Sequence, residues 1–242
     1  MIAVILCGGK GTRLAEETHS RPKPLVKIGS APILSHILNI YFKSGISDFV
    51  LALGYLGNEI INHYNKQWRE DAIYGSLRNY INLDFVDTGL NAMTGGRLHA
   101  LRERLSGEDE FLLTYGDGLS DVNIGDVIKF HRNHKKTATI TAVHPPARFG
   151  VLEIDDFRVT HFREKSQTDV GWINGGFFVL NKSILNLING EHTVLEEFPL
   201  EYLASNGELM AYKHDGFWQC MDTVRDKEYL EEIWYRGQAP WK

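Results

Sequence analysis

The alternation of apolar runs with amphipathic stretches is the feature that most limits the fold of this 242-residue chain. Short apolar runs bounded by turn residues indicate buried strands, and longer segments with apolar residues every three or four positions indicate helices. In the first half, the expected strands are residues 2–7, 49–54, 81–87 and 111–115. The expected helices run from Ser30 to Gly45 and over residues 58–68, 95–105 and 124–134. This alternation predicts an α/β protein with a mostly parallel central sheet flanked by helices on both faces.

The pattern changes near residue 138, where strands follow one another more closely. The expected strands of this second half are residues 138–143, 151–154, 159–162 and 173–180, and the expected helices are residues 194–206 and 223–236. The second half is therefore predicted to be richer in β-structure. Because no linker rich in Gly, Ser or Pro separates the halves 1–137 and 138–242, we expect a single domain over residues 1–242.

Charge and composition exclude a general attraction for nucleic acid or anionic membrane. The chain carries 26 Lys and Arg against 31 Asp and Glu, a formal net charge of −5, so local cations and backbone amides must hold any phosphate-bearing ligand. The two cysteines, Cys7 and Cys220, are far apart, which predicts free thiols in a reducing compartment. No targeting segment or apolar stretch of about 18 residues is present, so we expect a cytoplasmic protein with no membrane or nucleic-acid partner.

A glycine-rich segment follows the first expected strand and favours an anion-binding loop. In Cys7-Gly8-Gly9-Lys10-Gly11-Thr12-Arg13-Leu14, the glycines let backbone N–H groups approach a phosphate chain closely. A Walker A motif requires Ser or Thr where Gly11 stands, and a dinucleotide-binding fingerprint requires a third glycine where Leu14 stands, so both are excluded. The glycines alone would also fit a tight turn without a ligand.

Two further motifs place charged groups near this loop in the expected fold. The prolines of Pro22-Lys23-Pro24 restrict the backbone on both sides of the lysine, so its ammonium group is presented with reduced conformational freedom. The expected strand 111–115 leads into Asp117, which puts a carboxylate at the sheet edge where open α/β sheets bind ligands. Taken alone, each motif is also typical of an ordinary turn.

A pair of histidines gives a weaker indication. His131 and His134 lie three positions apart on an expected helix, a spacing that is compatible with a metal site. The neighbouring Arg132, Lys135 and Lys136 instead favour a solvated basic face. No zinc site is therefore predicted.

The glycine-rich and proline motifs together resemble the signature of sugar-1-phosphate nucleotidyltransferases. The resemblance begins with Leu6-x-x-Gly9-x-Gly11-Thr12-Arg13-Leu14 and Pro22-Lys23-Pro24. Within this family, the chain is most similar to the glucose-1-phosphate cytidylyltransferases. The segments that carry this closer similarity are Arg13-Leu14-x-Glu16-Glu17-Thr18, Val86-Asp87-Thr88-Gly89, Met93-Thr94-Gly95-Gly96-Arg97, Thr114-Tyr115-Gly116-Asp117-Gly118, Pro145-Pro146-x-Arg148-Phe149-Gly150, Asn174-Gly175-Gly176-Phe177-Phe178 and Gly216-Phe217-Trp218-Gln219-x-Met221-Asp222-Thr223.

The resemblance implies a Rossmann-like nucleotidyltransferase fold, with a nucleotide-binding half at 1–137 and a β-rich acceptor-binding half at 138–242. It implies that CMP is transferred from CTP to a sugar 1-phosphate, most closely glucose 1-phosphate. Arg13, Lys23 and Asp117 would be catalytic, and Asp117 and Asp222 would bind Mg²⁺. The nucleotide-binding residues would be Leu6, Gly8, Gly9, Gly11, Thr12, Arg13, Glu16, Gly96 and Arg97. The acceptor-binding residues would be Gly150, Glu164, Lys165, Asn174, Gly175 and Trp218.

The resemblance also implies a homo-oligomer, but the chain departs from the family pattern on the acceptor side. Ser166 and Cys220 stand where the family usually has proline, and residues 68–81 form a shorter segment than in glucose-1-phosphate cytidylyltransferases. The oligomeric state and the acceptor therefore stay open. The alternatives are a cytidylyltransferase for a different phosphorylated metabolite and a homologue that binds nucleotide without turnover.

Overall fold

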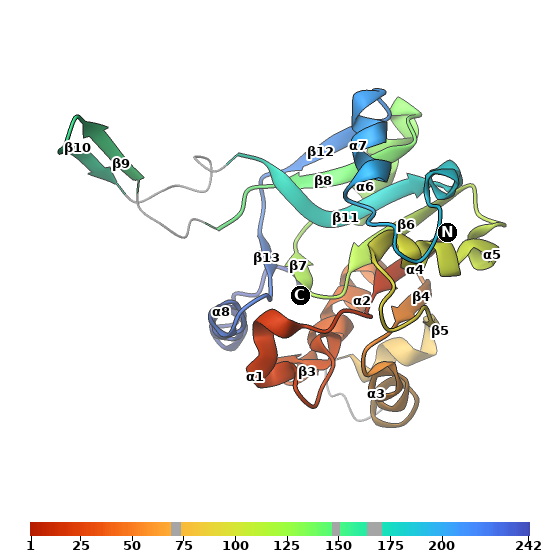
Figure 1. Cartoon of the computed structure of the whole chain (residues 1–242). Coiled ribbons are helices and arrows are strands. Elements are labelled where there is room, and N and C mark those ends of the chain that lie inside the picture. Colours follow the sequence, from red (N-terminus) through yellow and green to blue (C-terminus); the bar gives the residue numbers. More distant parts are fainter. Residues whose placement is uncertain (69–73, 147–150, 164–170) are drawn as a thin grey trace.

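The computed structural model describes residues 1–68, 74–146, 151–163 and 171–242. Its centre is a seven-stranded sheet with the strand order β12-β8-β11-β6-β1-β4-β5 (Figure 1). The strands are β1 (Ile2–Leu6), β4 (Asp48–Leu53), β5 (Asn82–Asp87), β6 (Glu110–Tyr115), β8 (Ala138–Val143), β11 (Ile173–Asn181) and β12 (Leu209–His214). All neighbouring pairs in this sheet are parallel except those of β11, which runs antiparallel to both β6 and β8. The predicted mostly parallel α/β architecture is confirmed.

Helices cover both faces of the sheet. The longer ones are α2 (Ile33–Lys43), α6 (Ile124–His134), α7 (Phe198–Ser205) and α8 (Val224–Tyr235), and the shorter ones are α1 (Ala15–Thr18), α3 (Gly57–Asn62), α4 (Thr94–Ala100) and α5 (Arg102–Leu105). One hydrophobic core packs α2, α3, α6 and α8 against one face, and a second packs α4, α5 and α7 against the other. Among the described residues, no helix is long and apolar enough to cross a membrane.

The alternation of side chains along β1 explains why the sheet has two cores. Ala3 and Ile5 belong to the first core, whereas Val4 and Leu6 belong to the second. Successive residues of a strand point to opposite faces, so an uninterrupted apolar run can bury both faces at once. All four of these side chains are buried. The carboxyl end of β1 is thereby held rigidly at the point where the glycine-rich loop begins.

Three small ribbons accompany the main sheet. They are β2 (Lys27–Ile28) with β3 (Ala31–Pro32), β7 (Gly118–Ser120) with β13 (Trp218–Cys220), and β9 (Val151–Asp155) with β10 (Arg158–Arg163). The β7–β13 pair joins the segment after β6 to the segment before α8, which are almost 100 residues apart in sequence. The β9–β10 hairpin is drawn apart from the seven-stranded sheet (Figure 1).

The structure differs from the sequence-based expectations in several elements. Residues 95–105 form two helices rather than one, since the backbone turns at Leu101. The helix expected over 194–206 begins only at Phe198, with a proline in its first turn. Strand β12, at the edge of the sheet, was not expected because its alternating pattern is weak. The division into halves at residue 137 stays a prediction.

The predicted solvated face around His131 is wrong for that residue. His131 is buried, with Nδ1 2.9 Å from Thr139 Oγ1 and Nε2 3.2 Å from Asn181 Oδ1. The basic neighbours Arg132 and Lys135 are exposed, as expected. A single histidine can face the core of an otherwise polar helix when both ring nitrogens find partners. Among the described residues, no cluster of three or more His, Cys, Asp or Glu side chains could hold a metal ion.

Candidate active site

A cavity of about 550 Å³ opens at the carboxyl ends of β1 and β6. Segments of both halves of the chain line it. The predicted site residues in its lining are Leu6, Gly8, Gly9, Gly11, Thr12, Arg13, Lys23, Arg97, Asp117, Asn174, Gly175, Trp218 and Asp222. The structure therefore brings together most of the residues that the sequence analysis assigned to nucleotide, metal and acceptor.

The remaining predicted residues lie elsewhere. Gly96 packs in α4 against the backbone of the segment before α7, where an added Cβ would lie 1.9 Å from the carbonyl oxygen of Glu191. Glu16 is exposed in α1, and neither residue belongs to the lining of the cavity. Gly150, Glu164 and Lys165 lie outside the described residues.

The glycine-rich loop leaves β1 with its first residues tied to β4. Cys7 N–H donates to the carbonyl oxygen of Ala52 at 2.9 Å, which continues the parallel pairing of the two strands. Gly11 adopts φ +64°, a conformation that strongly favours glycine, and its carbonyl oxygen accepts from the hydroxyl of Thr18 at 2.9 Å. The intervening Gly9 has open space around its Cα. The loop can therefore present backbone to a ligand while its two ends stay fixed.

Arg97 fixes this loop from beneath. Its guanidinium donates to the carbonyl oxygens of Gly8, Leu53 and Gly89 and to the hydroxyl of Thr88, at 2.7–3.1 Å. A Cβ on Gly8 would lie 2.0 Å from Arg97 Nη1, so only glycine allows this close approach. Burial lowers the pKa of Arg97, and Cys7 and Asp87 oppose that shift. A charged group in such surroundings needs all its donors paired, and here the pairing ties together the ends of β1, β4 and β5.

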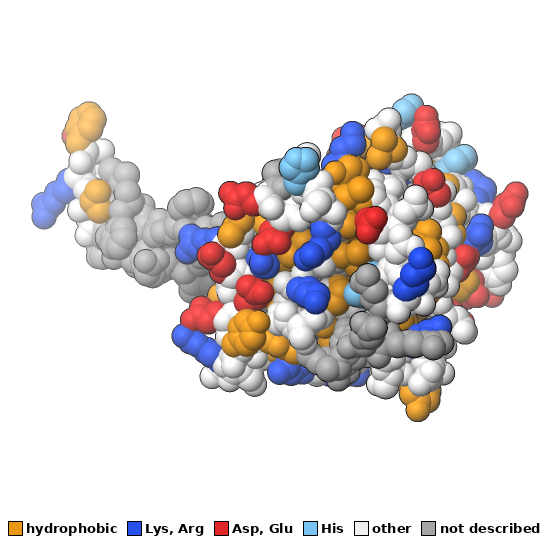
Figure 2. Space-filling view, turned by 90° about the horizontal axis from the view of Figure 1, so that it is seen from below, with side chains coloured by type: hydrophobic (Ala, Val, Ile, Leu, Met, Phe, Trp, Pro, Cys, Tyr) orange, Lys and Arg blue, Asp and Glu red, His pale blue; other side chains and the backbone are white. Residues whose placement is uncertain are grey.

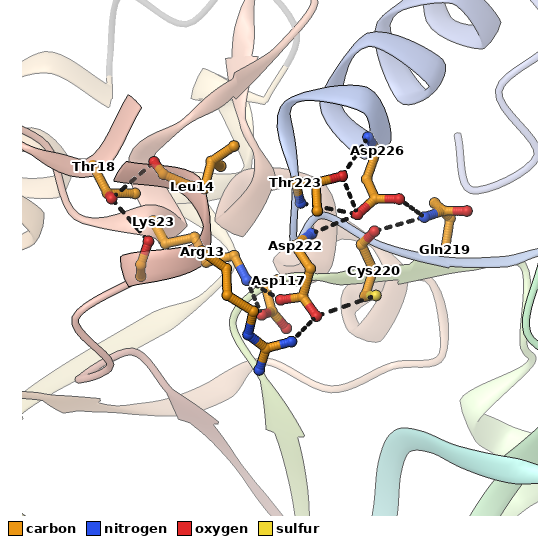
Figure 3. Close-up of polar contacts among 11 residues, drawn as sticks. Arg13, Leu14, Thr18, Lys23, Asp117, Gln219, Cys220, Asp222, Thr223 and Asp226 are labelled. Carbon is orange, nitrogen blue, oxygen red and sulfur yellow. Dashed lines mark hydrogen bonds and ion pairs between the residues drawn. The ribbon is translucent and has the colours of Figure 1, made fainter. Parts of the chain in front are cut away.

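Four charged side chains converge at the mouth of the loop (Figure 3). Lys23 Nζ lies 2.6 Å from Asp117 Oδ2 and 2.7 Å from Asp222 Oδ1, and Arg13 Nη1 lies 2.6 Å from Asp222 Oδ2. Burial alone would lower the pKa of Lys23, but the two carboxylates outweigh it and raise the pKa above its ordinary value. Lys23 is therefore held in its charged form.

The two carboxylates reach this point from different elements. Asp117 follows β6, directly after a strand that is buried between β1 and β11. Asp222 follows β13 and precedes α8, and its backbone N–H donates to Asp226 Oδ2 at 3.1 Å. Asp226 also accepts from the N–H and hydroxyl of Thr223, each at 2.9 Å, and closes a capping box at the start of α8. Asp226 was missed by the sequence analysis, although the pattern Thr-x-x-Asp before an amphipathic helix is its signature.

The opposite wall comes from β11 and β13. Trp218 Nε1 donates to the carbonyl oxygen of Gly175 at 2.7 Å, which joins the two strands across the cavity. Asn174 Oδ1 accepts from Gly176 N–H at 2.8 Å, and Gly176 has φ +81° where the pairing of β11 with β8 shifts register. Asn174 pairs with Ala142 just before this irregularity, and its side chain lines the cavity.

Further lining residues had no role assigned in the sequence analysis. They include Pro24, Ala92, Met93, Thr94, Thr114, Tyr115 and Cys220, whereas Cys7 was part of the glycine-rich segment. Burial, followed by the charges of Asp222 and Asp117, raises the pKa of the Cys220 thiol to about 12. A thiol with such a pKa is not a nucleophile near neutral pH, so neither this group nor the buried Cys7, whose pKa burial also raises, contributes chemistry of its own.

The paired carboxylates suit a divalent cation. Asp117 and Asp222 both contact a single ammonium group, so their oxygens already face a common point where positive charge is held. Mg²⁺ prefers oxygen ligands, is commonly bound by one or two carboxylates, and completes its shell with water and substrate phosphates. The residues present therefore fit Mg²⁺.

Comparisons with known proteins agree with this geometry. The chain is 48% identical to the glucose-1-phosphate cytidylyltransferase of Salmonella typhi, over 100% of this chain and 99% of that protein. It is 38% identical to a probable glucose-1-phosphate cytidylyltransferase of Bacillus subtilis, with the same coverage. Mannose-1-phosphate guanyltransferase beta-B of Xenopus laevis is a more distant relative, 33% identical over 95% of this chain and 63% of that protein.

Solved structures give the same result for the fold. HddC from Yersinia pseudotuberculosis, solved in complex with GMP-PN, superposes with a TM-score of 0.73 at 25% identity, covering 96% of this chain and 99% of that one. A UDP-glucose pyrophosphorylase complexed with UDP-glucose has a TM-score of 0.76 at 14% identity over 98% of both chains, which supports the fold alone. The model of the nucleotidyl transferase family matches residues 2–231. With nearly the whole chain matched and its characteristic motifs gathered around one cavity, the chain belongs to the nucleotidyl transferase family.

Proposed function

We propose that this enzyme transfers CMP from CTP to glucose 1-phosphate and releases pyrophosphate. The observation that carries the proposal is the convergence of Lys23 and Arg13 on Asp117 and Asp222 beside the glycine-rich loop. The similarity to two glucose-1-phosphate cytidylyltransferases over the full chain supports CTP as the nucleotide and glucose 1-phosphate as the acceptor.

The reaction exchanges one P–O bond for another. A phosphate oxygen of the acceptor attacks the α-phosphorus of CTP, a new P–O bond forms to give CDP-glucose, and the bond between the α- and β-phosphates breaks. A phosphate monoester with a second pKa of about 6 is already largely dianionic at neutral pH, so no general base is required. The work of the protein is to position two anions and to neutralise their repulsion.

The cations of the cavity would supply that neutralisation. In the proposed reaction, the side chain of Lys23 guides the phosphates into line and Arg13 stabilises charge on the triphosphate. Arg13 is exposed and can move toward a ligand, whereas Lys23 is largely buried between two carboxylates. The N–H groups of the loop at Gly8, Gly9 and Gly11 would bind the phosphate chain as an anion cradle.

Asp117 and Asp222 are the residues that would hold Mg²⁺. When bound, the ion would supply positive charge to both the acceptor phosphate and the α-phosphate. The two carboxylates balance the charges of Lys23 and Arg13 within this group of four side chains.

Recognition of the cytosine and of the sugar is also part of this proposal. Leu6, Gly8 and Arg97 line the cavity at the glycine-rich loop, where the base and ribose would lie. Asn174, Gly175 and Trp218 line it at β11 and β13, where the sugar would lie, and we propose that Gly150, Glu164 and Lys165 belong to the same subsite. Glu16 and Gly96 would act on the nucleotide side.

We also infer a cytoplasmic homo-oligomer. Free thiols at Cys7 and Cys220 are consistent with a reducing compartment. Figure 2 shows acidic and basic side chains interspersed over one face, without a broad area of one sign. Size-exclusion chromatography with light scattering tests the oligomer, and a mass equal to that of the monomer would contradict it.

Pyrophosphate release by the purified protein tests the activity. CTP, Mg²⁺ and glucose 1-phosphate should give release together with CDP-glucose, and UTP and dTTP should serve poorly. Asp117→Asn, which keeps the shape of the side chain and removes its charge, should abolish release. CTP-dependent release with another phosphorylated compound would replace glucose 1-phosphate as the proposed acceptor. Tight CTP binding without any release would favour a homologue that binds nucleotide without turnover.

A further inference from the structure

Glu196 lies just outside the cavity and contacts two residues of its lining. One carboxylate oxygen accepts a hydrogen bond of 2.5 Å from Thr94 Oγ1, at the start of α4. The other accepts from the hydroxyl of Tyr115, at the carboxyl end of β6. Thr94 and Tyr115 line the cavity, but Glu196 itself does not. Its influence on a ligand must therefore pass through these two hydroxyl groups.

The hydrogen bonds around Tyr115 have a defined direction. An ionised carboxylate only accepts, so the hydroxyl hydrogen of Tyr115 is committed to Glu196. The hydroxyl oxygen is left as an acceptor, and it receives Asn174 Nδ2 at 3.2 Å. The amide of Asn174 is fixed from the other side as well, because Gly176 N–H can only donate and lies 2.8 Å from Asn174 Oδ1. The oxygen of the Asn174 amide is therefore engaged, and one hydrogen of its Nδ2 is left for the cavity.

The ring of Tyr115 is also held in place by packing. Gly176 lies so close that a Cβ there would be 2.6 Å from Tyr115 Cδ2, and Phe178 packs edge-on with ring centroids 5.9 Å apart. These contacts hold the Tyr115 hydroxyl where it reaches both Glu196 and Asn174, so the geometry sets the direction of the hydrogen bonds.

The segment that carries Glu196 is fixed to α4. Met93 N–H donates to the carbonyl oxygen of Glu191 at 2.9 Å, Gly96 N–H donates to that of Thr193 at 3.1 Å, and Leu195 N–H donates to Thr94 Oγ1 at 2.9 Å. The Thr94 hydroxyl has one hydrogen, which must then go to Glu196. One carboxylate thereby orients two hydroxyl groups of the cavity lining.

From this network we infer that Glu196 is a positioning residue that turns Asn174 so that it offers an N–H group to the acceptor. The inference rests on the proposed function, because the acceptor is the ligand expected beside Asn174. The group recognised there is a hydrogen-bond acceptor, the oxygen of a sugar hydroxyl or of the acceptor phosphate. A substrate that presents only a hydrogen-bond donor to Asn174 should bind poorly, since Asn174 Oδ1 already accepts from Gly176 N–H.

Two substitutions of Glu196 test the inference in graded steps. Glu196→Leu removes both carboxylate oxygens, so the Tyr115 hydroxyl is no longer directed and no longer orients the Asn174 amide. The KM for glucose 1-phosphate should rise about tenfold or more, the effect expected for loss of a hydrogen bond to a charged group. Glu196→Gln keeps one acceptor for two donors and should have a smaller effect. The KM for CTP should stay within about twofold of wild type, since no hydrogen bond of the glycine-rich loop depends on Glu196. An equal rise in both KM values would overturn the inference.

Tyr115→Phe and a matched control separate positioning from general stability. Tyr115→Phe breaks the same chain of hydrogen bonds, so the Glu196→Leu/Tyr115→Phe double variant should have the same acceptor KM as Tyr115→Phe alone. Glu208 is the control, since its carboxylate accepts from Lys136 and Thr137 at the edge of the sheet, away from the cavity. Glu208→Gln and Glu208→Leu should leave both KM values unchanged. Additive effects of the two cavity substitutions would contradict a shared pathway.

A crystal structure of Glu196→Leu without ligands keeps this test independent of the proposed function. We expect the Asn174 amide to rotate, or its Nδ2 to move more than about 3.5 Å from Tyr115 Oη. An unchanged amide would overturn the inference whatever the substrate is. Wild-type turnover alone decides the proposed function, and the acceptor KM is measured with whichever phosphorylated compound the wild type uses.

Discussion

The two walls of the cavity are built in different ways. The glycine-loop wall, residues 6–13 with Arg97 beneath them, consists mainly of backbone that leaves a buried strand. The β11–β13 wall, Asn174, Gly175, Trp218 and Asp222, is held by individual side-chain hydrogen bonds. Those of Asn174 and Trp218 join segments far apart in sequence, and that of Asp222 comes from Asp226 in the next helix. The first wall inherits its geometry from the sheet, whereas the second depends on a few individual side chains.

This difference determines how each wall should respond to substitution. A wall fixed by strand pairing and glycine packing should tolerate few changes and should lose stability when one occurs. A wall held by single hydrogen bonds should stay folded when one of them is removed, but its side chains should no longer be placed accurately. A reaction between two anions depends on that placement. Lys23 lies between the two walls and contacts Asp222 of the β11–β13 wall and Asp117 after β6, so its loss should affect both carboxylates.

Lys23→Met should have the largest effect on turnover. The substitution removes the cation that lies between the two carboxylates, and we expect kcat to fall about 100- to 1,000-fold, the range typical for loss of one charge-stabilising group. Lys10→Met is the matched control, since Lys10 is exposed in the same loop and does not line the cavity. Steady-state kinetics on both variants check the expectation. Unchanged turnover in Lys23→Met would remove lysine from the proposed mechanism.

Arg97→Met should mainly reduce stability. The carbonyl oxygens of Gly8, Leu53 and Gly89 lose a buried donor, so we expect a loss of about 2–4 kcal/mol in the free energy of unfolding. The KM for CTP should rise as well, because the loop is no longer held from beneath. Urea denaturation and CTP titration measure the two effects.

Arg104 provides the comparison for Arg97. Its guanidinium pairs with Asp84 at 2.6 Å, but both side chains are about half exposed. Exposed ion pairs contribute little, so Arg104→Met should change stability by less than about 1 kcal/mol. Similar losses in the two arginine variants would contradict the view that the glycine-loop wall depends on buried hydrogen bonds.

Asp226→Ala should reduce turnover more than stability. It removes the capping box of α8, worth about 1–2 kcal/mol, and it also releases the backbone of Asp222. We expect kcat to fall about tenfold, since Asp222 then samples orientations that do not face Asp117. Asn123→Ala removes the N-cap of α6, which is not part of the cavity lining, and should lower stability by about 1 kcal/mol with no change in kcat. Equal kcat values in the two variants would show that Asp226 acts only as a cap.

The same contrast explains what the sequence could predict. The glycine-rich loop and Asp117 each follow an apolar strand, and Lys23 stands in a Pro-Lys-Pro motif, so local patterns singled these residues out. Each motif alone also fitted an ordinary turn, and the roles of these residues were assigned from the family resemblance. Asp222 is more than 100 residues from Asp117, and the contact depends on the pairing of β13 with β7, which no local pattern encodes. Its assignment came from a family resemblance. Glu196 and Tyr115 were missed for the same reason, since their significance lies in a hydrogen bond between β6 and a loop before α7.

The central strands of the sheet were predicted better than its edge strand β12, for a physical reason. Central strands such as β1 and β6 are buried on both faces and read as continuous apolar runs. Strand β12 lies at the edge, where one row of backbone groups is unpaired and side chains are only partly buried, so the hydrophobic pattern is weaker. His131 was misjudged because its neighbours in sequence are basic while its neighbours in space are Thr139 and Asn181.

The smallest predicted effect is a pH dependence of stability at His131 and His134, and it should leave both walls of the cavity unchanged. Lys136 N–H donates to His134 Nδ1, so the ring hydrogen of His134 is on Nε2 and is donated to Thr139 Oγ1. The Thr139 hydroxyl then donates to His131 Nδ1, and His131 Nε2 donates to Asn181 Oδ1. These hydrogen bonds engage both ring nitrogens of each histidine. Burial lowers the pKa of His134, as do His131 and Lys136, whereas Glu208 opposes them.

Because the folded state holds the pKa of His134 below its ordinary value, the unfolded chain takes up a proton first as the pH falls. Stability is therefore complete above about pH 6.5, the unfolded pKa, and should decline by less than about 1 kcal/mol below it. Urea denaturation at pH 7.5 and 5.5 should show a smaller pH-dependent loss in His134→Gln than in the wild type. His192→Gln, at an exposed histidine, should behave as the wild type does. Equal pH dependence in all three proteins would mean that protonation of His134 is not coupled to folding. The value of kcat should be unchanged in each variant, because these hydrogen bonds involve no residue of the cavity lining.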